Sequence, residues 1–123
     1  MLRILDAAFV VYPSSSEVRS RAFFEGVLGL SASMEHHDGE QFWVEYEVGS
    51  LTLGIGNEPF LKPCGDGPHL AIEVDNFETA IAHLRNCGAV FALEPFDGPA
   101  CRAAIILDPD GNRIGIHKRN RNS

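Results

Sequence analysis

The clearest hydrophobic pattern in the chain is a strict alternation of apolar and other positions over residues 41–48. The apolar positions are Phe42, Val44, Tyr46 and Val48, and the positions between them are Trp43, Glu45 and Glu47. Successive side chains of a β-strand point to opposite faces, so this segment predicts a strand whose apolar face packs against a helix. The face that carries Trp43 and Glu45 then points away from that helix.

The segments on either side predict a helix and three more strands. Residues 4–12 contain enough β-branched and aromatic side chains for a buried strand, and a proline follows them. Residues 31–35 and 51–55 are also strand-like, and glycine turns separate them from the alternating segment. After the first strand, a helix is predicted to start at a Ser15 or Ser16 cap. Its apolar positions recur at three- and four-residue steps and predict one buried face: Val18, Ala22, Phe23, Val27 and Leu28.

The same order of elements appears again in the C-terminal half. The glycines that end the two predicted helices, Gly29 and Gly88, differ by 59 positions (88 − 29), and the Gly-Ile pairs at Gly54 and Gly115 differ by 61 (115 − 54). A longer Asp-Pro-Asp-Gly-Asn turn before the last strand accounts for the added residues. The second half therefore predicts a strand at 69–74, a helix at 77–87 and strands at 90–94, 103–107 and 113–118. The repetition indicates an old duplication of a strand-helix-three-strand module, and an α+β fold.

The length of the chain limits its domain organisation. A chain of 123 residues fits one hydrophobic core and is too short for two independent domains of ordinary size. Hydrophobic residues make up 45% and charged residues 22%, which is an ordinary globular composition. We expect a single domain with a first module at about 1–56, an irregular link at about 57–67, a second module at about 68–118 and a polar tail at 119–123.

Charge and cysteine content narrow the partners and the compartment. With a formal net charge of −7 the chain would repel a phosphate backbone, so no nucleic-acid partner is predicted. No apolar stretch is long enough to span a bilayer, so no membrane role is predicted. The three cysteines, Cys64, Cys87 and Cys101, contain no CxxC pair, and the amino terminus does not resemble a signal peptide. These features predict a cytoplasmic protein.

Three segments resemble a known superfamily: residues 21–30 (RAFFEGVLGL), 68–76 (PHLAIEVDN) and 108–116 (DPDGNRIGI). They are similar to the vicinal-oxygen-chelate superfamily, which includes glyoxalase I, extradiol dioxygenases and bleomycin-resistance proteins. The resemblance covers nearly the whole chain. It implies paired βαβββ modules that form a curved, partly open eight-stranded sheet around a cleft. It also implies a homodimer, which open sheet edges favour independently.

The resemblance further implies a divalent metal held by side chains on the first and last strands of each module. In the second module His69 occupies the first-strand position, but the last-strand position is Gly115, which offers no ligand. The repeat offset places the positions of the first module at Ala7 or Ala8 and at Gly54, with Thr52 as a neighbouring alternative. A catalytic metal site generally needs three protein ligands. We therefore expect no metal and no cofactor, with a divalent metal as the alternative.

Strand parity predicts a small-molecule site on the sheet faces that point away from the helices. The ligand-binding residues expected there are Trp43, Glu45, Thr52, Gly54, His69, Ala71, Gly115 and His117. An aromatic wall with a carboxylate and imidazoles combines apolar contact area with a few orienting polar groups. If a reaction takes place, the catalytic candidates are His69, Glu45 and Glu73, because such groups can transfer a proton next to a carbonyl.

Each candidate also has an ordinary structural explanation. His69 can be a strand histidine bonded to backbone or water, and His117 can lie near the solvated end of its strand. Trp43 can belong to the core or to a subunit interface, where tryptophan is common. His36 and His37 resemble a metal-binding pair only in sequence, because adjacent strand residues point in opposite directions.

Two functions from different classes remain. The first is a metal-free binder of a small, partly apolar or aromatic molecule, as the resemblance to bleomycin-resistance proteins implies. The alternative is an enzyme of the glyoxalase, isomerase or dioxygenase type, acting on a small carbonyl or diol substrate. We favour the binder because three of the four metal-ligand positions carry side chains that cannot hold an ion.

Overall fold

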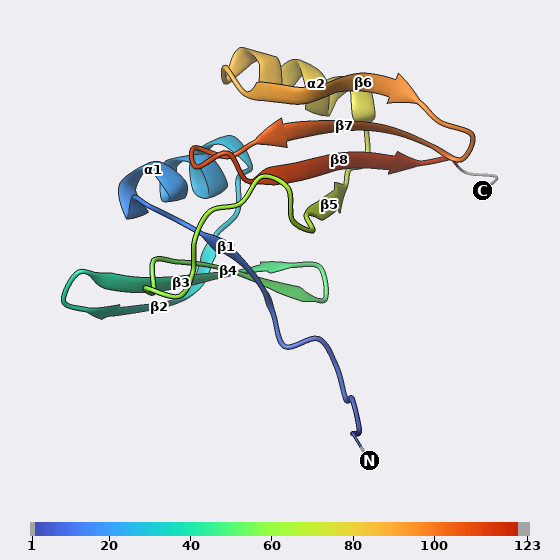
Figure 1. The fold of residues 1–123 in the computed structure, drawn as a ribbon. Coiled ribbons are helices and arrows are strands. Elements are labelled where there is room, and N and C mark those ends of the chain that lie inside the picture. The colour runs from blue at the N-terminus through green and yellow to red at the C-terminus, as the bar shows by residue number, and fades with distance from the viewer. Residues whose placement is uncertain (1, 121–123) are drawn as a thin grey trace. The chain divides into compact units, whose positions relative to one another are not determined.

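The computed structural model describes residues 2–120 and divides the chain into two compact units, Met1–Pro63 and Cys64–Ser123. Each unit contains one four-stranded sheet and one helical segment (Figure 1). The strand orders are β1-β4-β3-β2 and β5-β8-β7-β6, so the two sheets have the same topology. In each unit the first strand runs parallel to the last, and the other pairs are antiparallel. This repetition confirms the predicted α+β class and the tandem βαβββ modules.

The first module follows the predicted order of elements. It contains β1 (Val10–Pro13), α1 (Glu17–Arg21), η1 (Ala22–Val27), β2 (Ala32–Asp38), β3 (Gln41–Val48) and β4 (Leu51–Gly56). The bounds of β3 are those predicted. The strand predicted at 4–12 is wrong over residues 4–9, because β1 begins at Val10, which pairs with Leu53, and β4 begins only two residues before Leu53. Residues 4–7 therefore have no strand beside them, and Figure 1 shows the segment before β1 extending away from the sheet.

The first helical segment differs from the prediction in its buried face. The Ser16 side chain accepts a hydrogen bond from the Arg19 backbone N–H, which confirms one of the two predicted caps. The buried side chains of this segment are Ser20, Phe23 and Phe24, whereas Val18 is 81% exposed and Ala22 is also exposed. The expected burial of Val18 and Ala22 is therefore wrong. Hydrophobicity does not reveal this face because its N-terminal position is a serine, and the Ser20 hydroxyl is satisfied by a 2.5 Å hydrogen bond with the Ser14 hydroxyl.

The core of the first module forms between β3, β4 and the helical segment. The apolar face of β3 and β4 is almost fully buried: Phe42, Val44, Tyr46, Leu53 and Ile55. The ring of Phe24 from η1 stacks on Tyr46, with the ring centroids 5.9 Å apart. This burial confirms the predicted parity of β3 and assigns Trp43 and Glu45 to the face opposite α1 and η1.

The second module contains β5 (Leu70–Glu73), α2 (Phe77–Asn86), β6 (Val90–Asp97), β7 (Cys101–Leu107) and β8 (Arg113–Arg119). Every predicted element is present, and β6 is three residues longer than expected because register shifts let it follow β7 further. The predicted tail at 119–123 is wrong at its start, since β8 continues to Arg119, and residues 121–123 lie outside the described residues. Across the described residues, no helix has the length and apolar character needed to cross a bilayer.

The DPDG turn that leads into β8 is built around a buried carboxylate. Asp108 accepts hydrogen bonds from the backbone N–H groups of Asp110 and Asn112 and from the Asn112 side-chain amide, at 2.8–2.9 Å. Burial raises the pKa of Asp108, and these hydrogen bonds oppose the rise. The turn sets the register in which Gly115 pairs with Ala71, so the residues of this motif serve the fold.

Candidate functional site

The first module carries a cavity of about 450 Å³ on the sheet face opposite its helical segment. A volume of this order is common for small-molecule sites. The lining residues come from the end of the N-terminal segment, from β1, β2 and β3, and from the chain after β4: Phe9, Val11, Met34, His36, Trp43, Glu45, Glu58, Phe60 and Leu61. Apolar side chains predominate, and the ionisable groups are one imidazole and two carboxylates.

Two glycines of β4 form the sheet surface under the indole of Trp43. Gly54 pairs with Glu45, and Gly56 pairs with Trp43 itself. A Cβ at Gly54 would overlap the six-membered ring of Trp43, and a Cβ at Gly56 would lie 2.8 Å from another atom of that ring. The indole therefore occupies the space that side chains would fill at both positions. These strand glycines allow close approach of the aromatic ring to the backbone.

The indole of Trp43 is held by a hydrogen bond at its N–H and by an aromatic contact with its ring. Its N–H donates a 2.7 Å hydrogen bond to Oε2 of Glu45, two residues along β3. The ring of Phe9 meets it edge to face, with the centroids 5.1 Å apart and the planes at 75°. Aromatic pairs favour this arrangement. Trp43 is thus a preorganised aromatic wall rather than a freely rotating side chain.

The chain after β4 folds back to complete the pocket. The Asn57 side chain accepts from the Phe42 backbone N–H and donates to the Glu40 carbonyl, both at 2.9 Å, and so attaches this segment to the β2–β3 hairpin. The next residues form a turn in which the Leu61 N–H donates to the Glu58 carbonyl at 2.8 Å. This turn brings Glu58, Phe60 and Leu61 to the pocket.

The pocket contains two of the residues predicted for the first module, Trp43 and Glu45. Gly54 lies beneath the indole, and Thr52 donates to Glu47 at 2.8 Å outside the pocket lining. Sequence reasoning missed the remaining lining residues. Parity would have found Val11 and His36 once the strand bounds were known, but no pattern in the irregular link marked Glu58.

The second module presents a different group on the corresponding face of its sheet. Glu73 of β5 and His117 of β8 are paired in the parallel register, and Nδ1 of His117 lies 2.6 Å from Oε1 of Glu73. The Arg119 backbone N–H donates to Oε2 of Glu73 at 2.7 Å. This hydrogen bond is the main cause that lowers the pKa of Glu73, and the contact with His117 adds to it. Beside an ionised Glu73, the neutral imidazole of His117 donates from Nδ1 and has Nε2 as its acceptor.

The other residues predicted for the second module make no side-chain hydrogen bond with this pair among the described residues. His69 lies directly before β5 and is exposed, and the carboxylate of Glu73 contacts His117 instead. Gly115 is buried beside Ala71, where a Cβ would lie 3.1 Å from the Ala71 Cβ. Glu73 is therefore brought together with a predicted ligand-binding residue rather than with the predicted catalytic imidazole.

The metal positions implied by the superfamily resemblance do not fit a metal ion. Gly54 pairs with Val11 and Gly115 pairs with Ala71, so the first-module counterpart of His69 is Phe9. The predicted position at Ala7 or Ala8 is therefore wrong by one or two residues, because equivalent first-strand positions are 60 residues apart (71 − 11) and the last-strand glycines are 61 apart (115 − 54). Phe9, Gly54 and Gly115 have no donor atoms in their side chains. One imidazole cannot form a three-ligand metal site.

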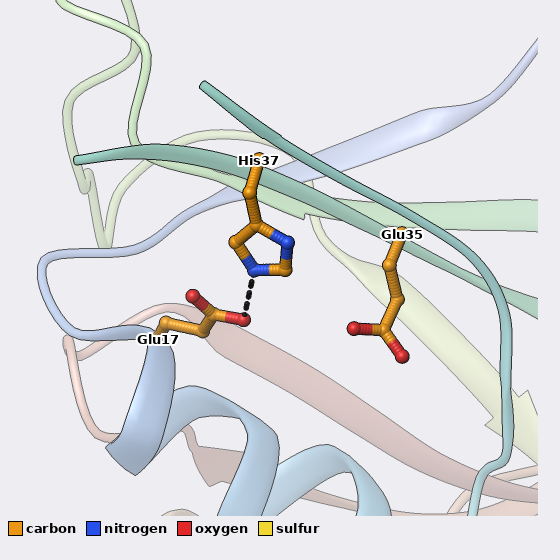
Figure 2. A group of neighbouring side chains, drawn as sticks. All are labelled: Glu17, Glu35 and His37. Carbon is orange, nitrogen blue, oxygen red and sulfur yellow. Dashed lines mark hydrogen bonds and ion pairs between the residues drawn. The ribbon is translucent and has the colours of Figure 1, made fainter. Parts of the chain in front are cut away.

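A second group of potential ligands lies on the helix side of the first module. Figure 2 shows Glu17 of α1 near Glu35 and His37 of β2. The potential ligating atoms of these three side chains lie within 4.8 Å of one another. His37 Nε2 lies 2.8 Å from Glu17 Oε2. The guanidinium of Arg21 also contacts both carboxylates, at 3.2 Å to Glu17 and 2.8 Å to Glu35. A cation is therefore already supplied by the protein, and this group reads as an ion-pair network that attaches α1 to β2.

Comparison with known proteins identifies relatives over most of the chain. The sequence model of the Glyoxalase/Bleomycin resistance protein/Dioxygenase superfamily matches residues 10–116. CFP32 of Mycobacterium bovis and Mycobacterium tuberculosis, a proposed glyoxylase, is 30% identical over 99 residues, which are 79% of this chain and 38% of CFP32. The chain thus spans less than two fifths of the length of these relatives.

Solved structures share the fold at lower sequence identity. TnmS3, an antibiotic binding protein from Streptomyces sp. CB03234, matches with a TM-score of 0.81 at 21% identity, over 98% of this chain and 100% of TnmS3. The trypanothione-dependent glyoxalase I of Leishmania major matches with a TM-score of 0.76 at 18% identity, over 94% of this chain and 87% of the enzyme. The same fold therefore occurs in a binding protein and in an enzyme.

Proposed function

Because the chain belongs to the glyoxalase/bleomycin resistance protein/dioxygenase superfamily, we propose that it binds a small, partly apolar or aromatic molecule without a metal ion. The observation that carries this proposal is the pocket of the first module. There an indole, fixed by Glu45 and Phe9, forms one wall of a mainly apolar cavity of about 450 Å³. TnmS3, whose name describes it as an antibiotic binding protein, supports a binding role on this fold.

The pocket has the features that favour binding of a flat apolar body. Trp43 and Phe9 offer large, rigid contact areas, and burial of apolar surface supplies most of the affinity of such sites. The indole N–H is already bonded to Glu45, so ligand binding leaves this group satisfied. Because the wall is preorganised, little side-chain entropy is lost on binding.

Calorimetric titration with 2-naphthylmethanol, a neutral aromatic probe, tests this proposal. We expect saturable binding to the wild type, and a loss of about tenfold or more in Trp43→Ala, because the substitution removes the main aromatic wall. Val18→Ala is the control, since Val18 is an apolar residue of the same module that is 81% exposed and lies outside the pocket lining. No binding to the wild type, or equal losses in the two variants, would contradict the proposed site.

The metal-free part of the proposal has its own test. Three of the four positions implied for a metal carry Phe9, Gly54 and Gly115, so elemental analysis of the purified protein should find no stoichiometric Zn, Ni, Mn or Fe. One tightly bound ion per chain would favour the metal-dependent enzymes of the superfamily.

A second candidate function is proton transfer in a glyoxalase- or isomerase-type reaction, and one observation favours it. The Glu73 carboxylate lies 2.6 Å from Nδ1 of His117, which favours the neutral tautomer with an unprotonated Nε2, and a carboxylate behind an imidazole is a common arrangement for a general base. In this reaction His117, rather than His69, would accept a proton next to a substrate carbonyl. A turnover with a carbonyl substrate that is lost in His117→Ala and kept in His69→Ala would support this function, and equal rates in both variants would exclude His117.

We further propose that the two units form a single domain, that the protein is a cytoplasmic homodimer, and that neither nucleic acid nor a membrane is a partner. The edge strand β6 carries the exposed apolar residues Val90, Leu93 and Phe96, which supports association. All three cysteines are free, as in a reducing compartment. Sedimentation velocity at micromolar concentration should show a dimer, and a monomer alone would exclude the homodimer.

A further inference from the structure

One carboxylate oxygen in the pocket lacks a partner although it is buried. Among the described residues, Oε2 of Glu58 is the one buried side-chain nitrogen or oxygen atom with no hydrogen bond. Buried polar groups in proteins nearly always have a hydrogen-bond partner, and a buried group without one lowers the stability of the fold. Because this atom belongs to a residue that lines the pocket, its missing hydrogen-bond partner is expected to be a group of the bound ligand.

The position of Glu58 follows from the glycine beneath it. A Cβ at Gly56 would lie 2.5 Å from Oε2 of Glu58 and 2.8 Å from the ring of Trp43. The absence of a side chain at Gly56 therefore lets the carboxylate approach the sheet surface next to the indole. Acid and aromatic ring share one wall of the pocket.

No lysine or arginine balances the charge of this wall. The ionisable residues of the pocket lining are His36, Glu45 and Glu58. Within residues 2–120, no ion pair joins His36 to either glutamate, and the Glu45 carboxylate accepts a hydrogen bond from the neutral N–H of Trp43. Two carboxylate side chains thus line a mainly apolar cavity, and carboxylates in such surroundings call for a cationic partner.

We infer that the molecule bound in the pocket carries a protonated amine or an amidinium group next to its apolar or aromatic body. This inference rests on the proposed binding function and assigns a charge to the ligand of that same site. The cationic group donates a hydrogen bond to the Glu58 carboxylate while it lies beside the face of Trp43. Hydrogen bonds to charged groups and cation–π contacts both favour this ligand over a neutral one of the same shape.

Three probes of one shape and different charge test the inference. Calorimetry at pH 7.5 compares 2-naphthylmethylamine, which is cationic, with neutral 2-naphthylmethanol and anionic 2-naphthoate. We expect the amine to bind the wild type about tenfold or more tightly than the alcohol, and the carboxylate to bind most weakly. In Glu58→Gln the affinity for the amine should fall to that for the alcohol, while the alcohol keeps its wild-type affinity.

Glu47→Gln is the matched control, because Glu47 lies on the same sheet face of β3 and bonds to Thr52 and Ser33 outside the pocket lining. It should keep the preference for the amine. Equal binding of amine and alcohol by the wild type would overturn the inference and leave the proposed function standing. A preference that survives in Glu58→Gln would also overturn it. If neither the amine nor the alcohol binds, the proposed function fails and the inference fails with it. If Glu58→Gln does not fold, the comparison of amine and alcohol binding to the wild type still decides.

Discussion

The two modules have the same topology and differ in what they place on the sheet face opposite the helix. In the first module Trp43 covers Gly54, and the chain after β4 closes a pocket around the indole. In the second module the equivalent Gly115 lies beside Ala71, and the nearby carboxylate of Glu73 is bonded to His117. Strand order fixes which positions face away from the helix, whereas side-chain volume and charge pairing decide what those positions do.

The carboxylates of the two faces show this difference most directly. Both oxygens of Glu73 have protein partners, one an imidazole and the other a backbone N–H. Glu58 in the first module has a buried oxygen without a partner. A satisfied carboxylate can orient a neighbouring side chain, whereas an unsatisfied one is available to a ligand. The proposed ligand site therefore belongs to the first module, and the proposed proton transfer would use His117 of the second.

The largest expected difference concerns the two equivalent glycines. Gly54→Ala should lower the free energy of unfolding by about 1–3 kcal/mol, because the added Cβ overlaps the ring of Trp43 and forces the indole away from Glu45. Gly115→Ala should cost less, below about 1 kcal/mol, since the nearest atom is the Ala71 Cβ at 3.1 Å and a small shift relieves the contact. Urea denaturation measures both, and Trp43, the single tryptophan, should change its emission only in Gly54→Ala. Equal losses would remove the distinction between the two faces.

The next largest difference in unfolding free energy is expected between the arginines Arg21 and Arg85, which attach the helical segments to their sheets. Arg21 contacts Glu17, Glu25 and Glu35 at 2.6–3.2 Å. Within the described part of the chain, Arg85 has one ion pair, with Glu94 at 2.6 Å and in a more exposed position, and its guanidinium lies over the ring of Phe91. Arg21→Met should lower the free energy of unfolding by about 1–2 kcal/mol, because it leaves three carboxylates close together. Arg85→Met should stay within about 0.5 kcal/mol. A larger loss in Arg85→Met than in Arg21→Met would contradict the ion-pair network of the first module.

A smaller difference between the modules is expected in how their carboxylates make the unfolding free energy fall at acid pH. The hydrogen bond from Arg21 lowers the pKa of Glu25 below its ordinary value of 4.5, and the Arg119 N–H lowers that of Glu73. Between the folded and unfolded pKa values the unfolded chain binds more protons, so the stabilisation is present above pH 4.5 and is lost as the pH falls. Glu25→Gln and Glu73→Gln should each flatten the fall of unfolding free energy below that pH.

The flattening should be larger for Glu25→Gln, because the side chain of Glu25 is 32% exposed and that of Glu73 is 50% exposed, so water screens the second more. Unfolding monitored by circular dichroism between pH 3 and 7 measures both profiles. Unchanged profiles in both variants would show that neither carboxylate is stabilised by folding.

The smallest effect is expected on the outer face of α1. Val18 is 81% exposed, so Val18→Lys should change the free energy of unfolding by less than about 0.5 kcal/mol. Thermal denaturation of this variant checks the corrected helix face. A loss of about 2 kcal/mol or more would restore the buried position that the apolar spacing predicts.

Alternation and repetition made most of the fold predictable. The pattern of β3 gave its bounds and its buried face, and the paired glycines at the helix ends, Gly29 and Gly88, have positive φ of 76° and 74°. The start of β1 was not predictable, because it depends on where β4 begins rather than on the composition of residues 4–9. The buried face of α1 was misjudged because Ser20 is buried through a partner, Ser14, that hydrophobicity does not reveal.

The site was predictable only where a regular strand carried it. Parity placed Trp43 and Glu45 on the pocket face, and both line the cavity. Glu58 and Phe60 belong to an irregular segment, and their positions depend on the Asn57 side chain and on a turn, neither of which has a periodic signal. The pairing of Glu73 with His117 rests on the parallel register between β5 and β8, strands that are far apart in the sequence.

The most direct test of the account follows the indole N–H signal of Trp43 by nuclear magnetic resonance while 2-naphthylmethanol is added in the presence of EDTA. The chain has one tryptophan, so one indole signal reports on the pocket. A metal-free pocket predicts a saturable shift of this signal that EDTA does not alter. A signal that stays fixed, or that moves only after a divalent ion is supplied, would contradict it.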